Sequence, residues 1–237
     1  MFGALGRLGL ALMLAAAAWP ACANVVVTGT RVIYPAGLRE QTVRLTNRGD
    51  APVLVQAWID EDERNDIPAK ARSPFLLTPA VFRLDPEKGQ SLRIRLIQEH
   101  LPTDRESVYW LNVLEVPVKP QFTNYLQMSI RTRLKLFYRP GGLLVQPDEL
   151  GNKLIWHVKK ENGKTYIECR NPTALNASLT ELDVLAGAQR VRVDADMVAP
   201  FSSRRWPLET QSAPTLLKFG LVNDFGAVVG LEAVIGQ

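Results

Sequence analysis

"NYLQMSIRTRLKLFYRP", residues 124–140, carries the pattern that decides the fold of this chain. Leu126, Met128 and Ile130 share one parity of an extended chain, and most residues between them are polar. A two-residue period is typical of a β-strand with one apolar face, because successive side chains of a strand point to opposite sides. Pro140 ends the run, since proline cannot donate a ladder hydrogen bond. The stretch therefore predicts a long strand that stops at residue 140.

The apolar face of this strand allows two interpretations. It packs on the core of its own domain, which is the ordinary case for a half-buried strand. Alternatively, it lies at a sheet edge and offers its apolar side chains and unpaired backbone groups to another chain. Because the period is the same in both cases, the choice depends on the rest of the sequence.

Strand-like runs separated by turn residues recur along the whole chain. They are residues 24–34, 41–47, 53–59, 81–85, 91–97, 108–116, 177–185, 189–198, 216–224 and 228–235. The clearest hairpin is residues 153–172, where two alternating strands flank "ENGK". No window has a sustained helical period, and the prolines fall mostly between the runs. This spacing predicts an all-β chain built from sandwiches.

Residues 1–23 have the features of a secretory signal. Arg7 precedes an apolar run, residues 8–19, that is too short to span a bilayer, and small residues follow. A lipid-anchored Cys22 is the alternative, but the bulky residues before it fit a lipidation site poorly. We therefore expect cleavage after Ala23 and an exported chain.

Pro140 and the two glycines that follow it break any regular element, so "YRPGG" is the predicted domain boundary. We expect two domains, residues 24–141 and 142–237, each long enough to form its own core. Once the leader is removed, Cys169 has no cysteine partner, so no intramolecular disulfide is expected. Cys169 is predicted to be a small buried apolar residue.

Composition and spacing argue against several classes of function. The net charge of +4 is spread along the chain without a basic run interleaved with aromatics, which disfavours nucleic-acid binding. His100 and His157 fall in different predicted domains and lack metal-ligand spacing. The acidic run 60–66 lacks the glycine and terminal glutamate of a calcium loop, and "NAS" at Asn176 is a weak glycosylation pattern. We expect no enzyme, no metal and no cofactor.

Cations follow in the second half of the quoted stretch. Arg131, Arg133 and Lys135 share one parity, and Arg139 immediately precedes Pro140. Repeated cations on a strand usually mark a solvated face. Arg139 lies at the domain boundary beside a rigid proline, where a cation can hold two domains at an angle by pairing with acids from each.

With these residues, the chain resembles the PapD-like periplasmic chaperones of the chaperone–usher pathway of pilus assembly. The motifs are "TRVIYP" (30–35), "DRES" (104–107), "LNVLEVP" (111–117), "LKLFYRP" (134–140), "NPT" (171–173) and "VNDFGA" (222–227). The resemblance extends over nearly all of the chain after the leader. It implies two tandem immunoglobulin-like β-sandwiches in an L or boomerang shape, with a cleft between the domains.

The resemblance also implies a role for the quoted strand. In that family, an edge strand of the chaperone completes the open fold of a pilus subunit that lacks its last strand. Leu126, Met128 and Ile130 match the donated apolar residues. Arg31 and Lys135 match two cations of the cleft that hold the C-terminal carboxylate of the subunit.

Glu106, Arg139 and Asp224 match an ion-pair network of the family at the domain junction. The implied function is that of a periplasmic chaperone, not an enzyme, whose partners are pilus or fimbrial subunits and an outer-membrane usher. Neither nucleic acid nor membrane insertion is expected, and the exposed edge strand predicts weak self-association of the free protein. The alternative is a secreted two-domain immunoglobulin-like binding or structural module without strand donation; a hydrolase is the least supported class.

Overall fold

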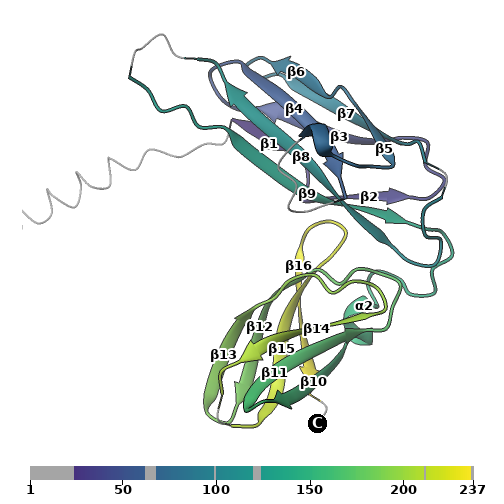
Figure 1. Cartoon of the computed structure of the whole chain (residues 1–237), viewed down its shortest axis with the longest axis vertical. Coiled ribbons are helices and arrows are strands. Elements are labelled where there is room, and N and C mark those ends of the chain that lie inside the picture. The colour runs from purple at the N-terminus through teal and green to yellow at the C-terminus, as the bar shows by residue number, and fades with distance from the viewer. Residues whose placement is uncertain (1–23, 62–67, 99, 120–123, 211, 236–237) are drawn as a thin grey trace, which may run out of the picture.

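Two β-sandwiches joined at an angle give the chain the shape of a boomerang (Figure 1). The computed structural model describes residues 24–61, 68–98, 100–119, 124–210 and 212–235. The predicted leader and most of the acidic run lie outside the described residues. The all-β, two-sandwich prediction is confirmed. None of the helices in the described part of the chain has the length and apolar character needed to cross a membrane.

The first sandwich packs a four-stranded sheet against a five-stranded sheet. The four-stranded sheet has the order β1 (Val25–Val27), β3 (Gln41–Asn47), β7 (Gly89–Leu96) and β5 (Phe75–Thr78). The five-stranded sheet has the order β2 (Arg31–Pro35), β9 (Ile130–Arg139), β8 (Ser107–Pro117), β4 (Val53–Asp60) and β6 (Val81–Leu84). A 3-10 turn, η1 (Pro68–Lys70), lies between β4 and β5. The Thr78–Pro79 peptide bond is cis.

The run predicted as one strand over residues 24–34 forms two strands in different sheets. β1 pairs antiparallel with β3, whereas β2 pairs parallel with β9. Gly29 lies between them at φ 88°, a backbone conformation that glycine adopts without steric cost. The change of sheet places Arg31 beside β9.

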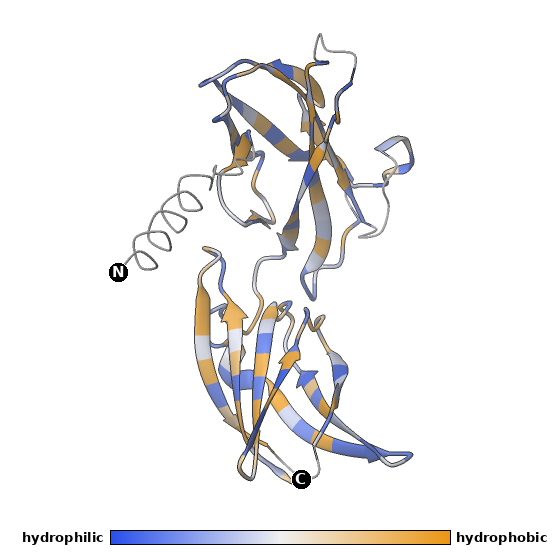
Figure 2. Cartoon of the chain, turned by 90° about the vertical axis from the view of Figure 1, so that its left-hand side faces the viewer, coloured by the Kyte–Doolittle hydropathy of each residue, from blue (hydrophilic) through white to orange (hydrophobic). Residues whose placement is uncertain are grey.

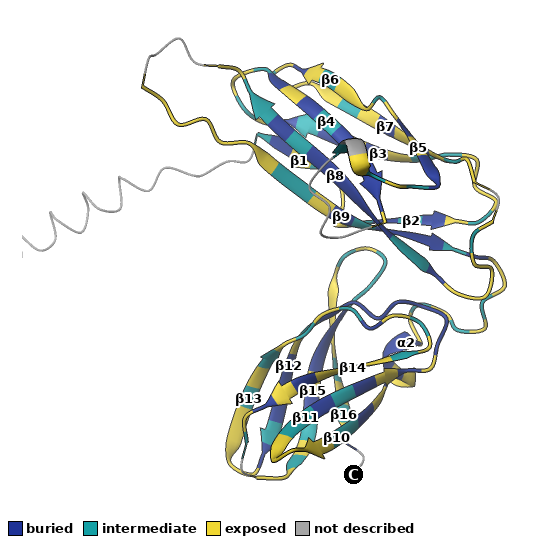
Figure 3. Cartoon of the chain, viewed as in Figure 1, coloured by how far each residue is buried: buried dark blue, intermediate teal, exposed yellow. Residues whose placement is uncertain are grey.

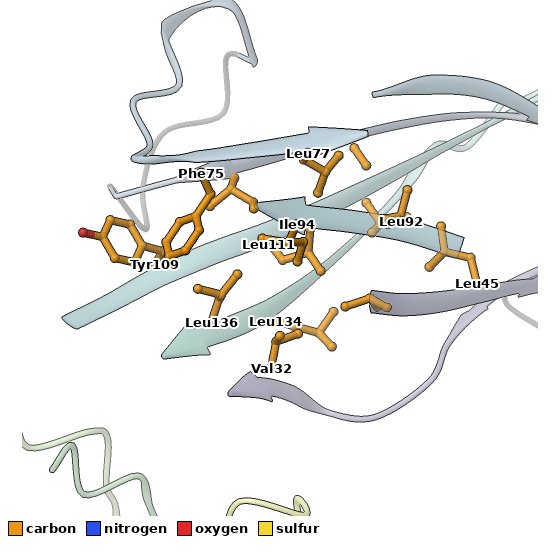
Figure 4. Packing of buried hydrophobic residues seen from close by; sticks show 14 of the residues in the cluster. Val32, Leu45, Phe75, Leu77, Leu92, Ile94, Tyr109, Leu111, Leu134 and Leu136 are labelled. Atoms are coloured by element: carbon orange, nitrogen blue, oxygen red, sulfur yellow. The ribbon is translucent and has the colours of Figure 1, made fainter. Parts of the chain in front are cut away.

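Apolar side chains from both sheets meet in the core of the first domain (Figure 4). Hydrophobic and hydrophilic residues alternate along strands of both sheets (Figure 2), as expected where one face of each sheet packs on the core. On β9, Leu134 and Leu136 are 4% and 0% exposed, so the even-numbered residues face the core. The odd-numbered residues of β9 consequently lie on the opposite face of the sheet.

The predicted strand over 124–140 is wrong in its first part. β9 begins at Ile130, and the segment 124–129 leading into it is exposed along its whole length (Figure 3). The ladder with β8 ends at the pair Glu115–Ile130, two residues before β8 itself ends at Pro117. Among the described residues, the segment 124–129 belongs to no strand ladder.

The second sandwich has one three-stranded and one four-stranded sheet. The three-stranded sheet has the order β10 (Ile155–Glu161), β11 (Lys164–Asn171) and β14 (Ser202–Leu208). The four-stranded sheet has the order β13 (Gln189–Asp194), β12 (Leu179–Ala186), β15 (Pro214–Val222) and β16 (Val228–Val234). A one-turn helix, α2 (Leu150–Lys153), precedes β10. The predicted hairpin is confirmed, with Asn162 and Gly163 at positive φ between paired Glu161 and Lys164.

The second domain has its own core, which shares no residue with the first. Trp156 packs between Trp206 and Phe219, at ring-centroid distances of 6.5 and 5.0 Å. Cys169 is fully buried there, and burial raises the pKa of its thiol to about 12, so this thiol is unreactive at neutral pH. The predicted boundary after Gly141 lies between the two cores.

Candidate functional site

Three cations project from one face of the β2–β9 pair toward the second domain. The parallel register places Arg31 of β2 directly opposite Lys135 of β9, and Arg139 lies farther along the same face of β9. Both arginines bond to residues at the turn between β15 and β16, described below. The face of β9 that points away from its own core therefore forms one wall of the cleft between the domains.

Arg31 is held against the second domain by its guanidinium group. Its Nη1 donates a hydrogen bond of 3.0 Å to the backbone carbonyl of Val222, and its Cζ lies 5.6 Å from the ring centroid of Phe137. Burial lowers the pKa of Arg31, and the nearby carboxylates of Asp224 and Glu106 oppose that shift. Its Nε is buried without a hydrogen-bond partner among the described residues. A buried cationic N–H without an acceptor favours binding of an anion.

Lys135 lies on the same face with its side chain 21% exposed. Its Nζ is 5.6 Å from the ring centroid of Trp110, its register partner on β8, and 3.9 Å from a carboxylate oxygen of Asp196 in the second domain. Arg31 and Lys135 are thus adjacent, partly desolvated cations. A forked guanidinium beside an ammonium group suits a single carboxylate.

Arg139 joins the two domains through its guanidinium group. Its Nε donates to Glu106 at 2.6 Å, and its Nη1 and Nη2 donate to the two carboxylate oxygens of Asp224 at 2.6 and 2.8 Å. Burial opposes the charged form of Arg139, but the hydrogen bonds and charges of Asp224 and Glu106 raise its pKa overall. The structure thus brings together the three residues that the sequence assigned to an ion-pair network.

Asn176 belongs to this network, although sequence reasoning considered it only as a glycosylation pattern. The second carboxylate oxygen of Glu106 accepts hydrogen bonds from the backbone N of Asn176 at 2.8 Å and its Nδ2 at 3.2 Å. The backbone N of Glu106 donates to the carbonyl of Ala174. Glu106 is only 5% exposed, and these bonds satisfy its carboxylate from both domains.

The "NPT" motif holds the loop that reaches Glu106. The fully buried Asn171 donates from Nδ2 to the carbonyls of Leu175, Val198 and Ala199, and its Oδ1 accepts from the backbone N and hydroxyl of Thr173. A short polar motif at the end of β11 therefore fixes the backbone that bonds to the first domain. The motif begins five residues before Asn176, and this closeness was the only feature of the sequence that pointed to the contact between Asn176 and Glu106.

The turn between β15 and β16 is the part of the second domain that touches both arginines (Figure 1). Asn223 organises it by accepting hydrogen bonds at Oδ1 from the backbone N of Phe225 and of Ala227. Gly226 is at φ 86°, and a Cβ there would overlap the hydroxyl of Thr30 in the first domain. The turn therefore packs so closely on β2 that a side chain at this position is excluded.

We predict that Arg139→Ala changes the angle between the domains more than it changes their unfolding. The variant loses charge-assisted hydrogen bonds worth about 1.5–3 kcal/mol each across the junction, whereas each core stays intact. Small-angle scattering is expected to show a larger radius of gyration and a broader set of shapes. Arg205→Ala is the matched control, because its 2.6 Å pair with Glu161 lies within the second domain. Scattering profiles of Arg139→Ala identical to wild type would refute this orienting role.

Leu126, Met128 and Ile130 are 85%, 68% and 40% exposed. They continue the even-numbered apolar positions of β9, such as Leu134 and Leu136, to the N-terminal side of the core, and these three exposed side chains are called the apolar row. No core in the described chain covers this row.

The described residues contain no group of three or more His, Cys, Asp and Glu side chains that could hold a metal ion. His100 is exposed and His157 lies on β10 in the other domain, so the two histidines do not share a site. The chemistry of the cleft, with Arg31 and Lys135 side by side, suits binding of an anion.

Comparison with known proteins gives matches over nearly the whole described chain. The family model described as "Pili and flagellar-assembly chaperone, PapD N-terminal domain" matches residues 24–144, and "Pili assembly chaperone PapD, C-terminal domain" matches residues 149–233. The chain is 43% identical to the chaperone protein FimB/FhaD of Bordetella pertussis over 242 residues, covering 98% of each chain. It is 39% identical to the probable fimbrial chaperone YadV of Escherichia coli, over 87% of this chain and 88% of the relative.

Solved structures agree with these relatives. The crystal structure of the YadV chaperone superposes with a TM-score of 0.76 at 36% identity, covering 90% of this chain and 100% of the other. A structure of the Salmonella enterica SafA pilin in complex with the SafB chaperone gives a TM-score of 0.75 at 26% identity, covering 91% of this chain and 98% of the other. The two family models, the relatives and the shared two-domain fold show that this chain belongs to the PapD-like family of pilus-assembly chaperones.

Proposed function

We propose that this protein captures pilus subunits in the periplasm by donating the segment that leads into β9, and delivers them to an outer-membrane usher. One observation carries this proposal: the exposed apolar row Leu126, Met128 and Ile130 lies on the segment that leads into β9, and β9 continues from there to Lys135, which is paired with Arg31. The predicted secretory signal and the family support a periplasmic location. Membership of a chaperone–usher family supports delivery to an usher.

The strand register supports the direction in which a subunit binds. β2 covers one edge of β9 only from Lys135 onward, because its first residue, Arg31, is paired there. On the other edge, β8 pairs with β9 from Ile130. Beside residues 130–134, the edge on the β2 side therefore has no strand partner in the described chain. An added strand parallel to β9 on that edge ends in front of Arg31 and Lys135, which places its C-terminal carboxylate between the two cations.

The solved complex of a related chaperone also supports subunit binding. A solved structure shows the SafA pilin in complex with SafB, a chaperone 26% identical to this chain. An equivalent complex here would bury apolar side chains that the free chain leaves exposed, which is the gain that drives association.

The direct test is capture of a fimbrial subunit that lacks its last strand. The denatured subunit is diluted into buffer with and without this chain, and complexes are separated by size-exclusion chromatography. We expect a 1:1 complex with the incomplete subunit. The control is the same subunit with a donor strand fused to it, which fills its own core and should not bind. If both subunits bind equally, or neither binds a folded chaperone, the two-domain module without strand donation becomes the better account.

We predict that the free protein self-associates weakly. The apolar row is exposed next to an open strand edge, and an edge of this kind pairs readily with a second copy. Sedimentation velocity at increasing concentration is expected to show a reversible dimer that dissociates when an incomplete subunit is added. A strict monomer at high concentration would contradict this prediction.

A further inference from the structure

Asp196 brings a negative charge from the second domain to the cation pair of the cleft. It follows β13, and its Oδ1 lies 3.9 Å from Nζ of Lys135. This distance is too long for a hydrogen bond, so the attraction between the two groups is mainly Coulombic. The Asp196 side chain is 51% exposed, which leaves it open toward solvent.

The Asp196 carboxylate is fixed by its surroundings rather than by Lys135. Its Oδ2 lies 3.0 Å from Nη2 of Arg204, and its Oδ1 accepts a hydrogen bond of 2.6 Å from the backbone N of Met197. Arg204 also donates from Nη1 to the carbonyl of Met197 at 3.0 Å. Because two contacts hold this carboxylate in place, and a third holds Arg204 to the same loop, an arriving anion meets a negative charge that does not readily turn away.

We propose, building on the carboxylate-binding role proposed above for Arg31 and Lys135, that Asp196 is an internal competitor of the subunit carboxylate. In the free protein, its charge partly neutralises Lys135. In the complex, the same charge remains beside the bound carboxylate and repels it. The positive charge of Arg204 limits this repulsion without removing it, since Arg204 contacts Oδ2 of Asp196, whereas Oδ1 is the oxygen nearer to Lys135.

Such a competitor weakens the clamp by a limited amount. A chaperone that hands its cargo to another protein must release the carboxylate, and a fixed nearby anion raises the rate of release. The repulsion acts through a partly exposed pair, so its size is that of surface electrostatics and falls as salt is added. Asp196 thus adjusts how tightly the clamp holds, whereas Arg31 and Lys135 provide the binding itself.

The experiment measures binding of a peptide that copies the C-terminal strand of a fimbrial subunit, made with a free carboxylate and with a C-terminal amide. Fluorescence anisotropy gives the dissociation constants for the full-length chaperone at low and high salt. We expect Asp196→Asn to bind the free-carboxylate peptide about two- to fivefold more tightly than wild type at low salt. The gain should shrink at high salt and be absent for the amide peptide.

Glu161→Gln is the matched control. It also removes one carboxylate paired with an arginine of β14, Arg205, but on a different face of the domain. Arg204→Gln separates charge from loop structure, because it exposes the charge of Asp196 while removing the bonds that hold the loop. If Asp196 competes by its charge, Arg204→Gln should bind the free-carboxylate peptide more weakly than wild type, while Asp196→Asn binds it more tightly. If the variants act by loosening the loop, Asp196→Asn and Arg204→Gln should change binding in the same direction.

The outcomes separate this role from the proposed function. If wild type binds the carboxylate and amide peptides equally, the clamp itself is wrong. If wild type prefers the carboxylate but Asp196→Asn binds no more tightly than Glu161→Gln, the clamp stands and Asp196 is not a competitor. Weaker binding by Asp196→Asn would instead mean that Asp196 positions Lys135 for its ligand, and would overturn the competitor role.

Discussion

Replacing Arg31 and Lys135 together by alanine is expected to abolish stable capture of a fimbrial subunit. Truncating one partner of a desolvated charge pair at an interface costs about 2–5 kcal/mol, because the other charge is left unpaired. That corresponds to a loss of roughly 30-fold to several thousandfold in affinity for each residue. The two losses need not add, since both cations bind one carboxylate. Isothermal titration or surface binding with an incomplete subunit measures the difference.

Two further variants separate the clamp from the general charge of the protein. Arg44→Ala with Arg93→Ala removes the same charge from exposed positions on the opposite sheet, and should leave capture unchanged. Arg31→Lys keeps the charge but loses the planar fork, so we expect an intermediate affinity.

The clamp can also be tested from the side of the ligand. Extending the subunit beyond its natural C-terminus moves the carboxylate away from the cations, and should weaken binding to wild type but not to the double alanine variant. Wild-type affinity in the double variant would remove the clamp from the mechanism.

Changing Leu126, Met128 and Ile130 together to serine is expected to have an effect of similar size. Burying each apolar side chain in a subunit contributes roughly 1.5–3 kcal/mol as an upper estimate, so the triple variant loses several kcal/mol of binding free energy. These side chains are largely exposed in the free protein, so its free energy of unfolding should change little. Affinity for the incomplete subunit and thermal unfolding of the free chaperone, measured side by side, check both statements.

The strand itself supplies the control for the triple variant. Gln127 and Ser129 have the opposite parity, so they point away from the subunit core when the segment pairs as a strand. Gln127→Ser with Ser129→Ala should therefore bind almost as tightly as wild type. If both sets of changes weaken binding equally, the segment does not bind as a strand with one inserted face.

Local sequence patterns predicted much of the fold. The alternation in residues 124–140 predicted a strand, which forms from Ile130 onward with Leu134 and Leu136 buried, and the "ENGK" turn predicted a hairpin. Both depend on neighbours in the chain, because strand parity and turn geometry are set within a few residues. β14 was missed, since its apolar residues come only at its end, at Trp206 and Leu208, after two serines and two arginines.

Positions that depend on strand pairing were harder to predict. A single run over 24–34 was expected, but β1 and β2 belong to different sheets. The strand expected from residue 124 begins at Ile130, where its ladder with β8 stops at the pair Glu115–Ile130. The length of a strand is decided by its partners as well as by its own residues.

By itself, the sequence determined an all-β chain of sandwiches, and the resemblance of its motifs to one family then pointed to the candidate residues of the cleft. Only the tertiary structure decided how they meet: the parallel β2–β9 register puts Arg31 opposite Lys135, and the β15–β16 turn brings Asp224 to Arg139. It also added Asn176 and Asp196, which no local pattern had connected to the cleft. The physical reason is that these contacts join residues far apart in the chain, within one sheet for Arg31 and Lys135 and across the domain junction for the others. Hydrophobic periodicity records which face of a strand is buried, but it carries no information about which distant charges meet there.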